Sequence, residues 1–262
     1  MGAPSVAIIV NCYSETGNSS FVSNLVKHYQ EFPVSLKEKF ELILVDDHSP
    51  CPLVSFVQGD LNMRILRVDD DIPWNQPGAR NLGVVYSRSD KIVMHDVGQC
   101  LPPQTLEKIV RMANPSNRIY KFIGVSERDA SLKLKSHPNT LFMSRSRFLR
   151  HYGYDEEFAG NYGREDTCFT RLQRRFGARI KCLPNRYPVV CRERDENFVY
   201  SDLKRDKEVN TALMEKKLNL ARRRDERCFS RKFLSFSFHL AKEFRLGGGP
   251  SDERVIEPSS GI

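Results

Sequence analysis

Short apolar runs alternate with amphipathic segments along the first half of the chain. Four runs rich in branched apolar residues lie between segments whose apolar side chains follow helical spacing; the runs span residues 6–11, 40–45, 63–68 and 91–94. A run that is apolar at consecutive positions is typical of a strand buried on both faces, as in a parallel sheet. Strands that alternate with helices favour right-handed βαβ units. The sequence therefore predicts an α/β fold, with a mostly parallel sheet flanked by helices.

The second half of the chain predicts shorter strands and three further helices. The strands are expected at residues 119–125, 140–143, 179–183 and 187–190, and the helices at 165–176, 203–224 and 229–246. The last helix rests on apolar residues at spacings of four, three, four and four, which are Phe229, Phe233, Phe236, Leu240 and Phe244. We therefore expect an α/β domain over residues 1–225, an amphipathic basic helix as a C-terminal extension over 226–246, and a flexible tail over 247–262.

The composition excludes several classes of protein. The 262 residues are 40% hydrophobic and 28% charged, so the chain can bury a core. No apolar run approaches the roughly 20 residues of a membrane-spanning helix, and the early run at 6–10 is too short for a signal peptide. Seven cysteines, an odd number without C-x-x-C spacing, argue against a disulfide framework or a zinc site. We therefore expect a cytoplasmic protein.

The net charge of +8 is concentrated near the C-terminus. Residues 203–245 hold 13 Lys and Arg against 6 Asp and Glu, whereas the rest of the chain is nearly neutral. Three interpretations of the segment at 229–244 stay open: packing against the main domain, peripheral contact with a membrane surface, and contact with a second copy. No DNA- or RNA-binding module accompanies the charge, so a specific nucleic-acid partner is not expected.

Polar side chains follow three of the predicted strands, at the point where each strand ends. The first strand leads into Cys12 and Tyr13, the second into Asp46 and Asp47, and the fourth into Asp96. Because ligands bind at the carboxyl ends of strands in an open parallel sheet, these residues predict a polar cleft. Asp46 and Asp47 can instead cap a turn without any ligand. Neither G-x-G-x-x-G nor G-x-x-x-x-G-K-[ST] occurs, which excludes the usual dinucleotide and P-loop cradles.

Four segments occur in a distinctive order and spacing: VAIIVNCYSE, ELILVDDHSP, PGARNLGVVYSRSDKIVMHDVGQCLPP and FAGNYGREDTCF. Together they resemble a family-2 glycosyltransferase of the GT-A fold, a Rossmann-like architecture, over residues 6–210. The resemblance implies transfer of a sugar from a nucleotide diphosphate donor, usually with inversion at the anomeric carbon. We expect a UDP-sugar as donor, a hydroxyl of a glycan or lipid-linked glycan as acceptor, and a place in polysaccharide biosynthesis.

The resemblance also implies roles for individual residues. Asp166 matches the catalytic base, which takes the proton of the acceptor hydroxyl, and Glu165 helps to hold acceptor or sugar hydroxyls. The two acids can alternatively serve only as first-turn helix residues favoured by the helix dipole. The residues expected to contact the nucleotide-sugar are Cys12, Tyr13, Asp47, Trp74, Asn75, Arg80 and Asp96. Tyr13 offers a flat face to the base, and Asp47 accepts hydrogen bonds from the base or ribose. Trp74 and Asn75 form either a wall that faces the sugar or a loop anchored by a buried indole.

The sequence departs from the family at both metal positions. Asp96 matches the first aspartate of the D-x-D motif, but Gly98 replaces the last one, which holds Mg²⁺ or Mn²⁺ in most relatives. A histidine that follows a late strand in many relatives is also absent, and the stretch there carries Arg192 and Arg194. Three hypotheses stay open: the two arginines neutralise the diphosphate in place of a metal, Asp96 with phosphate and water still holds the ion, or the site is inactive.

Two functions of other classes are also consistent with the sequence. Gly98 allows a catalytically inactive protein that binds a nucleotide-sugar. The basic C-terminal segment allows an adaptor for a membrane or a nucleic acid. The enzyme hypothesis differs from both because it alone requires the carboxylate of Asp166.

Overall fold

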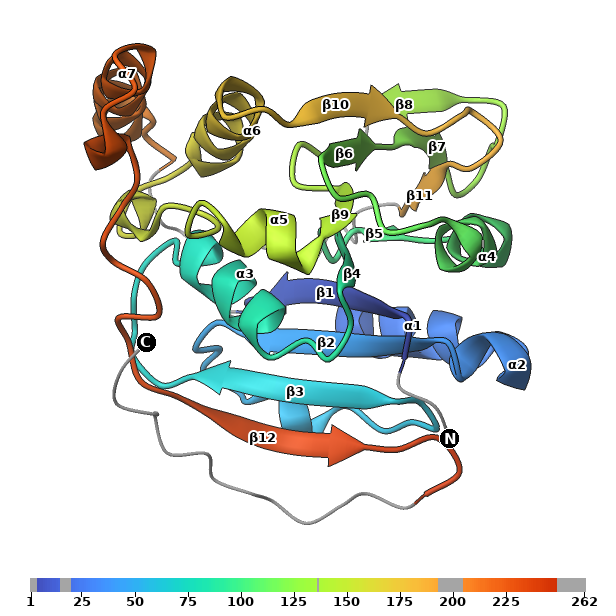
Figure 1. Ribbon diagram of the computed structural model, residues 1–262. Helices are drawn as coiled ribbons and strands as arrows, with labels where there is room; N and C mark the ends of the chain where they lie inside the picture. The colour runs from blue at the N-terminus through green and yellow to red at the C-terminus, as the bar shows by residue number, and fades with distance from the viewer. Residues whose placement is uncertain (1–3, 15–19, 136, 193–204, 249–262) are drawn as a thin grey trace.

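An eight-stranded mixed sheet forms the centre of the protein. The computed structural model describes residues 4–14, 20–135, 137–192 and 205–248. The sheet has the strand order β10-β6-β9-β4-β1-β2-β3-β12 (Figure 1). Its strands are β1 Val6–Cys12, β2 Phe40–Asp46, β3 Met63–Val68, β4 Lys91–Met94, β6 Arg118–Lys121, β9 Leu141–Ser144, β10 Arg179–Cys182 and β12 Phe238–Phe244. Strands β4, β1, β2 and β3 are parallel, whereas β9 and β12 run antiparallel to their neighbours.

Helices cover both faces of this sheet (Figure 1). One face packs against α1 Ser20–Gln30, α2 Val34–Lys37 and α4 Pro103–Arg111, and the other packs against α3 Gln76–Val85 and α5 Arg145–Leu149. Successive side chains of a strand point to opposite faces. Ile8 of β1 therefore belongs to one core and Ile9 to the other, and both are buried. This two-sided burial explains why the strands are apolar at consecutive positions, and it confirms the predicted α/β fold.

A second, four-stranded sheet has the order β5-β11-β7-β8. Its strands are β5 Gln99–Cys100, β7 Ile123–Ser126, β8 Lys133–Lys135 and β11 Val189–Cys191. The sequence predicts one strand over residues 119–125, but the structure divides this stretch between β6 of the large sheet and β7 of the small one. The division falls at Phe122, whose buried side chain packs into the core between the two strands.

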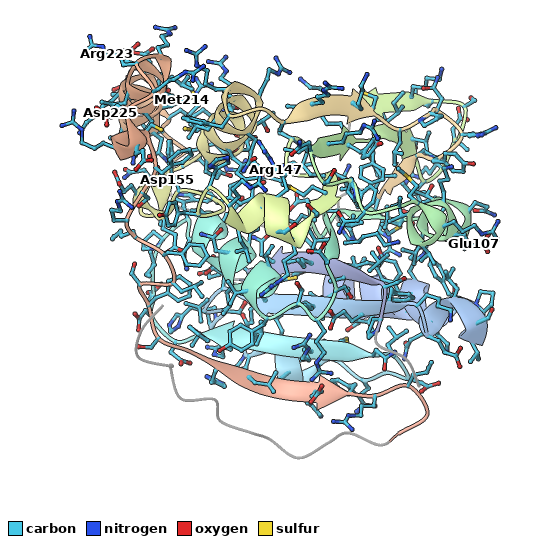
Figure 2. All side chains as sticks on the ribbon, in the orientation of Figure 1. Glu107, Arg147, Asp155, Met214, Arg223 and Asp225 are labelled. Carbon is cyan, nitrogen blue, oxygen red and sulfur yellow. The ribbon has the colours of Figure 1, made fainter. Side chains whose placement is uncertain are left out.

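Helices α6 Glu165–Arg175 and α7 Glu208–Arg222 pack against each other and form a third apolar cluster with Cys168, Leu172, Met214 and Ala221. Arg147 of α5 donates to the carbonyl oxygens of Gln173 and Phe176, both at 3.0 Å, and so fixes the end of α6 (Figure 2). Single-turn 3₁₀ helices occupy Leu53–Ser55, Glu156–Phe158 and Glu226–Cys228. The predicted helix at 165–176 is confirmed.

The predicted basic helix over 226–246 is wrong. After the 3₁₀ turn the chain passes through several bends without forming a helix. Strand β12 then pairs antiparallel with β3, from Phe238 opposite Val68 to Phe244 opposite Met63. The open edge of β3 offers unpaired N–H and C=O groups, and pairing satisfies them, which local helical spacing cannot reveal. The large sheet therefore includes residues beyond 225, so that position is not a domain boundary. The predicted tail over 247–262 lies almost wholly outside the described residues.

The interpretation of residues 229–244 as a membrane contact loses its structural basis. Phe236, Leu240 and Phe244 are buried against the sheet, so they do not form the exposed apolar face of a helix. Among the helices in the described part of the chain, none is both long and apolar enough to cross a bilayer. All seven cysteines lie in the described residues and are unpaired there.

Candidate functional site

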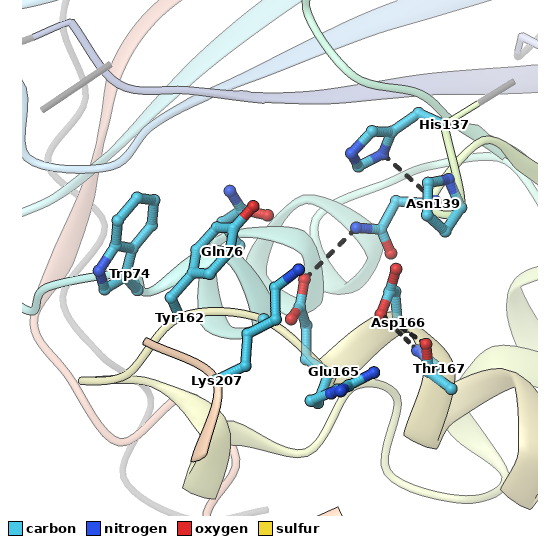
Figure 3. A pocket seen from close by; sticks show the side chains of 12 residues that line it. Trp74, Gln76, His137, Asn139, Tyr162, Glu165, Asp166, Thr167 and Lys207 are labelled. Carbon is cyan, nitrogen blue, oxygen red and sulfur yellow. Dashed lines mark hydrogen bonds between the residues drawn. The ribbon is translucent and has the colours of Figure 1, made fainter. Parts of the chain in front are cut away.

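A cavity of about 220 Å³ lies beside the N-terminal end of α6 (Figure 3). Four stretches of chain contribute to it: the connection from β3 to α3, the residues before β9, the loop that enters α6, and the residue before α7. The side chains that matter most for its chemistry are Trp74, His137, Tyr162, Glu165, Asp166 and Lys207. The cavity therefore joins residues that are far apart in the sequence.

Asp166 lies in the first turn of α6 and lines this cavity. Left-handed backbone at Gly163 (φ 79°) and Arg164 (φ 75°) turns the chain sharply into the helix. The Asp166 Oδ1 atom accepts hydrogen bonds from the backbone N–H and the hydroxyl of Thr167, at 2.5 and 3.1 Å, and no residue in the described ranges donates to Oδ2. A carboxylate fixed through one oxygen and open through the other can receive a proton from a bound hydroxyl.

Glu165 lies beside Asp166 but is buried. Its Oε1 atom accepts a 3.4 Å hydrogen bond from the amide of Asn139 (Figure 3). The same atom is 3.9 Å from Nη1 of Arg80. Burial raises the pKa of Glu165, the neighbouring Asp166 raises it further, and Arg80 acts in the opposite direction. Both acids lie in the first turn, as the helix-dipole hypothesis requires, yet both also line the cavity.

Arg80 lies beneath the cavity, enclosed by protein. Its side chain is 1% exposed, its Nη1 atom donates to Oε1 of Gln76 at 3.1 Å, and its guanidinium lies 5.7 Å from the centre of the Tyr154 ring. The sequence predicts Arg80 beside the nucleotide-sugar. In the structure its guanidinium donates to Gln76 and faces Glu165, and its contact with a donor stays a prediction. Its contact with Glu165 makes it a positioning residue for that carboxylate.

Asn139 connects the groups below the cavity. One orientation of its amide accepts from the Tyr154 hydroxyl at 2.6 Å and donates to Glu165. The reversed orientation donates to Tyr154 and accepts from both terminal nitrogens of Arg80 at 3.2 Å. In either orientation Asn139 is fully buried and bonds to the Tyr154 phenol. One orientation adds the Glu165 carboxylate, and the other adds the Arg80 guanidinium.

Asp47 follows β2 and is half-buried. Its Oδ1 atom accepts a 3.1 Å hydrogen bond from the buried amide of Asn75, which lies between two residues that line the cavity, Trp74 and Gln76. Burial raises the pKa of Asp47 to about 7, the neighbouring Asp46 contributes in the same direction, and the Asn75 amide and Arg80 oppose the shift. A carboxylate held this way changes charge near neutral pH.

Asp46 has a structural role instead. Its carboxylate accepts from the backbone N–H groups of Ser49 and Leu53, at 2.9 and 3.0 Å, and from Arg67 at 2.6 Å. These bonds satisfy the turn after β2. The turn-capping hypothesis is therefore correct for Asp46, whereas the carboxylate of Asp47 bonds to Asn75.

Asp96 lies on another side of the same region. Its Oδ2 atom is 3.9 Å from Nε2 of His137, which lines the cavity. Burial raises the pKa of the Cys12 thiol well above its ordinary value, and the charges of Asp46, Asp96 and Asp47 add to this shift because they lie nearby. Asp47, Asp96 and Asp166 therefore come from distant parts of the chain to the same region.

Cys12 is buried, and Tyr13 beside it is 36% exposed.

Trp74 is half-buried, with its ring centre 4.7 Å from that of Tyr162, and both rings line the cavity. The left-handed backbone at Trp74 (φ 54°) directs the indole toward Tyr162. The sequence left two alternatives for Trp74, a wall of the site or an anchor for its loop. The indole does both, because it packs on Tyr162 and also contributes to the cavity wall.

The two positions that depart from the family lie side by side. The N–H of Arg192 donates to the carbonyl oxygen of Gly98 at 2.9 Å. The Arg192 guanidinium lies 3.7 Å from Glu127, and burial raises the pKa of the Cys100 thiol while Arg192 partly offsets that shift. Its side chain is thus held beside Glu127 and Cys100, and Arg194 lies outside the described residues.

A divalent ion would find few protein ligands here. No cluster of three or more His, Cys, Asp and Glu side chains suited to a metal occurs in the residues that the structure describes. Asp96 and His137 are two side chains close enough to share an ion, with 3.9 Å between Oδ2 and Nε2, and Gly98 has no side chain to contribute. These residues fit Mg²⁺ or Mn²⁺ only if a bound diphosphate completes the coordination shell.

The residues of the site that sequence reasoning missed include His137, Asn139, Tyr162, Arg164 and Lys207. Tyr162 lies within the FAGNYGREDTCF segment, where an aromatic residue next to the two acids was the available signal. Lys207 was hidden in the basic stretch before α7. His137 and Asn139 precede a short strand and carry no local pattern.

Asn210 of α7 holds the loop that carries Tyr162. Its side chain is fully buried, and Nδ2 donates to the carbonyl oxygens of Phe158, Asn161 and Gly163 at 3.1, 2.9 and 2.8 Å. One side chain of α7 therefore sets the path of the backbone into Glu165 and Asp166.

The fold is similar to those of solved glycosyltransferases. TarS residues 1–349 of S. aureus, in complex with UDP-GlcNAc, match with a TM-score of 0.57 and 15% identity over 83% of this chain and 72% of that one. Another structure of S. aureus TarS matches with a TM-score of 0.54 and 18% identity, over 80% of this chain and 42% of that one. The mannosyltransferase PcManGT of Pyrobaculum calidifontis, in complex with GDP-Man and Mn²⁺, matches with a TM-score of 0.55 and 16% identity. The match covers 84% of this chain and 63% of that one.

At these identities the structural likeness shows a shared GT-A fold. No curated protein matches the sequence significantly. The model of the family described as glycosyl transferase family 2 matches residues 7–178, about two thirds of the chain, which include β1, β2, Asp96 and both acids of α6. The chain therefore belongs to glycosyl transferase family 2, and it is a glycosyltransferase of the GT-A fold.

Proposed function

We propose that the protein transfers a sugar from a nucleotide diphosphate donor, a UDP-sugar, to a hydroxyl of a glycan or lipid-linked glycan, with inversion at the anomeric carbon. One observation carries the proposal: the Asp166 carboxylate, anchored through Oδ1, lines a cavity that is linked to Asp47 through Asn75 and to Asp96 through His137. Carboxylates that bind the donor and a carboxylate that takes a proton are the groups that such a transfer needs.

Different residues of the site bind the nucleotide, bind the sugar and accept the proton. Asp47 accepts hydrogen bonds from the base or ribose, and the exposed ring of Tyr13 flanks the base. Trp74 and Tyr162 pack against the apolar face of a sugar ring, while Glu165, held by Arg80 and Asn139, accepts hydrogen bonds from sugar hydroxyls. Asp166 takes the acceptor proton as the new glycosidic bond forms and the nucleoside diphosphate leaves from the opposite face.

The leaving diphosphate needs positive charge. With a diphosphate bound, Asp96 and His137 would hold Mg²⁺ or Mn²⁺, which supplies charge neutralisation to the leaving group. The alternative role for Arg192 requires its side chain to leave Glu127, and the role of Arg194 stays a prediction from the sequence. Recovery of turnover by Mn²⁺ after EDTA treatment would favour the metal, and turnover that resists EDTA would favour the arginines.

The choice of a UDP-sugar rests on Asp47. A carboxylate accepts the N3–H of uracil, and TarS is a structural neighbour solved with UDP and UDP-GlcNAc. PcManGT was solved with GDP-Man, so guanine is the competing base. Thermal unfolding with UDP, GDP and their sugars, each with and without Mn²⁺, tests the choice, because a ligand that binds only the folded state raises Tm. A larger shift with GDP than with UDP would contradict our proposal.

Release of UDP from a UDP-sugar, with and without glycan acceptors, tests the catalytic assignment. Asp166→Asn keeps the side-chain shape and removes the base, so we expect turnover to fall roughly 10²- to 10⁴-fold with UDP affinity preserved. Glu107→Gln, on the outer surface of α4, is the matched control (Figure 2). Undiminished turnover in Asp166→Asn would overturn the assignment. Donor binding without turnover in the wild type would favour the inactive nucleotide-sugar-binding protein.

A further inference from the structure

A cation with a prepared position faces the catalytic cavity, and neither the sequence motifs nor the proposed chemistry assigns it a role. Lys207 precedes α7, and its ammonium group lies 5.2 Å from the centre of the Tyr162 ring (Figure 3). A Cβ atom placed on Gly163 would meet the aliphatic part of Lys207 at 3.5 to 3.8 Å, so this stem packs along the loop that enters α6. The side chain is therefore held on both sides by the catalytic loop.

The charge of Lys207 faces an aromatic ring and is not neutralised by a carboxylate of the described chain. Within the described ranges, no carboxylate oxygen lies within 4.0 Å of its Nζ atom. The two acids of the cavity have other partners, since Glu165 faces Arg80 and Asn139 and the Oδ1 atom of Asp166 accepts from Thr167.

A second cation lines the same cavity. Arg164 donates from Nε to the hydroxyl of Thr211 at 3.0 Å, and this bond fixes the guanidinium without neutralising it. As with Lys207, no carboxylate of the described chain forms an ion pair with Arg164. The guanidinium of Arg205 also lies over Tyr162, 5.9 Å from the ring centre. Lys207 and Arg205 therefore place positive charge over Tyr162, and Arg164 adds a further cation to the lining of the cavity.

We propose that Lys207 and Arg164 form a subsite for an anionic group of a substrate, a phosphate or a carboxylate, at the catalytic cavity. Ammonium and guanidinium groups bind such oxyanions through charge-assisted hydrogen bonds. The anion comes either from the donor diphosphate or from an acidic group of the acceptor. The inference rests on the proposed function in treating the cavity as the place of transfer.

Binding measurements with uridine, UDP and inorganic phosphate test the subsite without any need for turnover. Lys207→Met removes the charge and keeps an unbranched apolar stem, Lys207→Arg keeps the charge, and Lys216→Met on the exposed face of α7 is the matched control. If the subsite binds the donor diphosphate, Lys207→Met weakens UDP binding roughly tenfold or more and leaves uridine binding unchanged. Lys207→Arg and Lys216→Met then bind UDP like the wild type.

If the subsite binds the acceptor, UDP affinity is unchanged in Lys207→Met. The UDP-saturated wild type then binds inorganic phosphate, and Lys207→Met loses this binding while Lys207→Arg keeps it. The inference would be overturned if wild type and Lys207→Met bound UDP equally and also bound phosphate equally, both in the presence and in the absence of UDP. A wild type that binds phosphate through Lys207 but neither hydrolyses nor transfers a sugar would contradict the proposed function and leave the subsite in place.

Discussion

The backbone N–H of Arg192 donates a 2.9 Å hydrogen bond to the carbonyl oxygen of Gly98. This bond joins two positions that, from the sequence, are expected to differ from the metal site usual in the family, and it continues the pairing of β5 with β11 in the small sheet. The two departures are thus one local feature, located two residues from Asp96.

Gly98→Asp should strengthen binding of Mn²⁺ in the presence of UDP. A Cβ atom at Gly98 meets nothing within 4 Å, so the substitution should fit without strain. A second carboxylate near Asp96 adds a hard oxygen ligand, and we expect roughly tenfold tighter Mn²⁺ binding by calorimetry. Gly98→Ala, which adds the Cβ alone, is the control. Equal Mn²⁺ affinity in all three proteins would show that this position does not face the ion.

Asn210→Asp should lower kcat while UDP affinity stays within about twofold. The substitution keeps the size of the side chain and removes the donor that binds three carbonyl oxygens of the loop before Glu165. A displacement of about 1 Å in a catalytic group costs up to about 10²-fold in rate, whereas Asp47 lies on a different segment. Steady-state kinetics and UDP calorimetry measure the two effects separately.

Asn219→Asp on the same helix is the control for this variant, because its side chain is exposed. A purely structural role of Asn210 would lower Tm and leave kcat per folded molecule at the wild-type value. That result would show that Asn210 does not position the loop that leads into Glu165 and Asp166.

UDP binding should strengthen about tenfold between pH 6 and pH 8. The pKa of Asp47 is raised to about 7, so the free protein holds a neutral carboxyl at pH 6 and a carboxylate at pH 8. Only the carboxylate is a full acceptor for a base or ribose donor, so a fall in pH through 7 costs affinity. Calorimetry at several pH values measures this slope, and Asp47→Asn should flatten it. A slope of the same size in Asp47→Asn would assign the effect to another group.

Leu240→Ala should lower the free energy of unfolding by about 2 kcal/mol or more. Leu240 is 9% exposed and pairs with Leu66 where β12 closes the edge of the sheet. Chemical denaturation followed by circular dichroism measures the loss, and Arg245→Ala, at an exposed position just after β12, should be close to neutral. If residues 229–246 formed an independent membrane-binding helix, Leu240→Ala would leave stability unchanged and abolish vesicle binding.

The sequence by itself determined the parallel strands and the positions of the acids that follow them. Strands buried on both faces must be apolar at every position, as at Ile8 and Ile9, and this local requirement is visible without any contact map. Asp47 and Asp96 were found because polar residues at strand ends interrupt that pattern, whereas Asp166 was assigned through the resemblance to the family.

Only the tertiary structure decided which of these residues face the cavity and what supports them. Arg80 became a buried partner of Glu165. Lys207 joined the site from the position before α7, and Asn210 of α7 holds the loop that leads into it. Residues 238–244 became a strand because β3 offered an unpaired edge, although their spacing suits a helix. Pairing across an edge and contacts across a cavity join residues distant in sequence, so local periodicity carries no record of them.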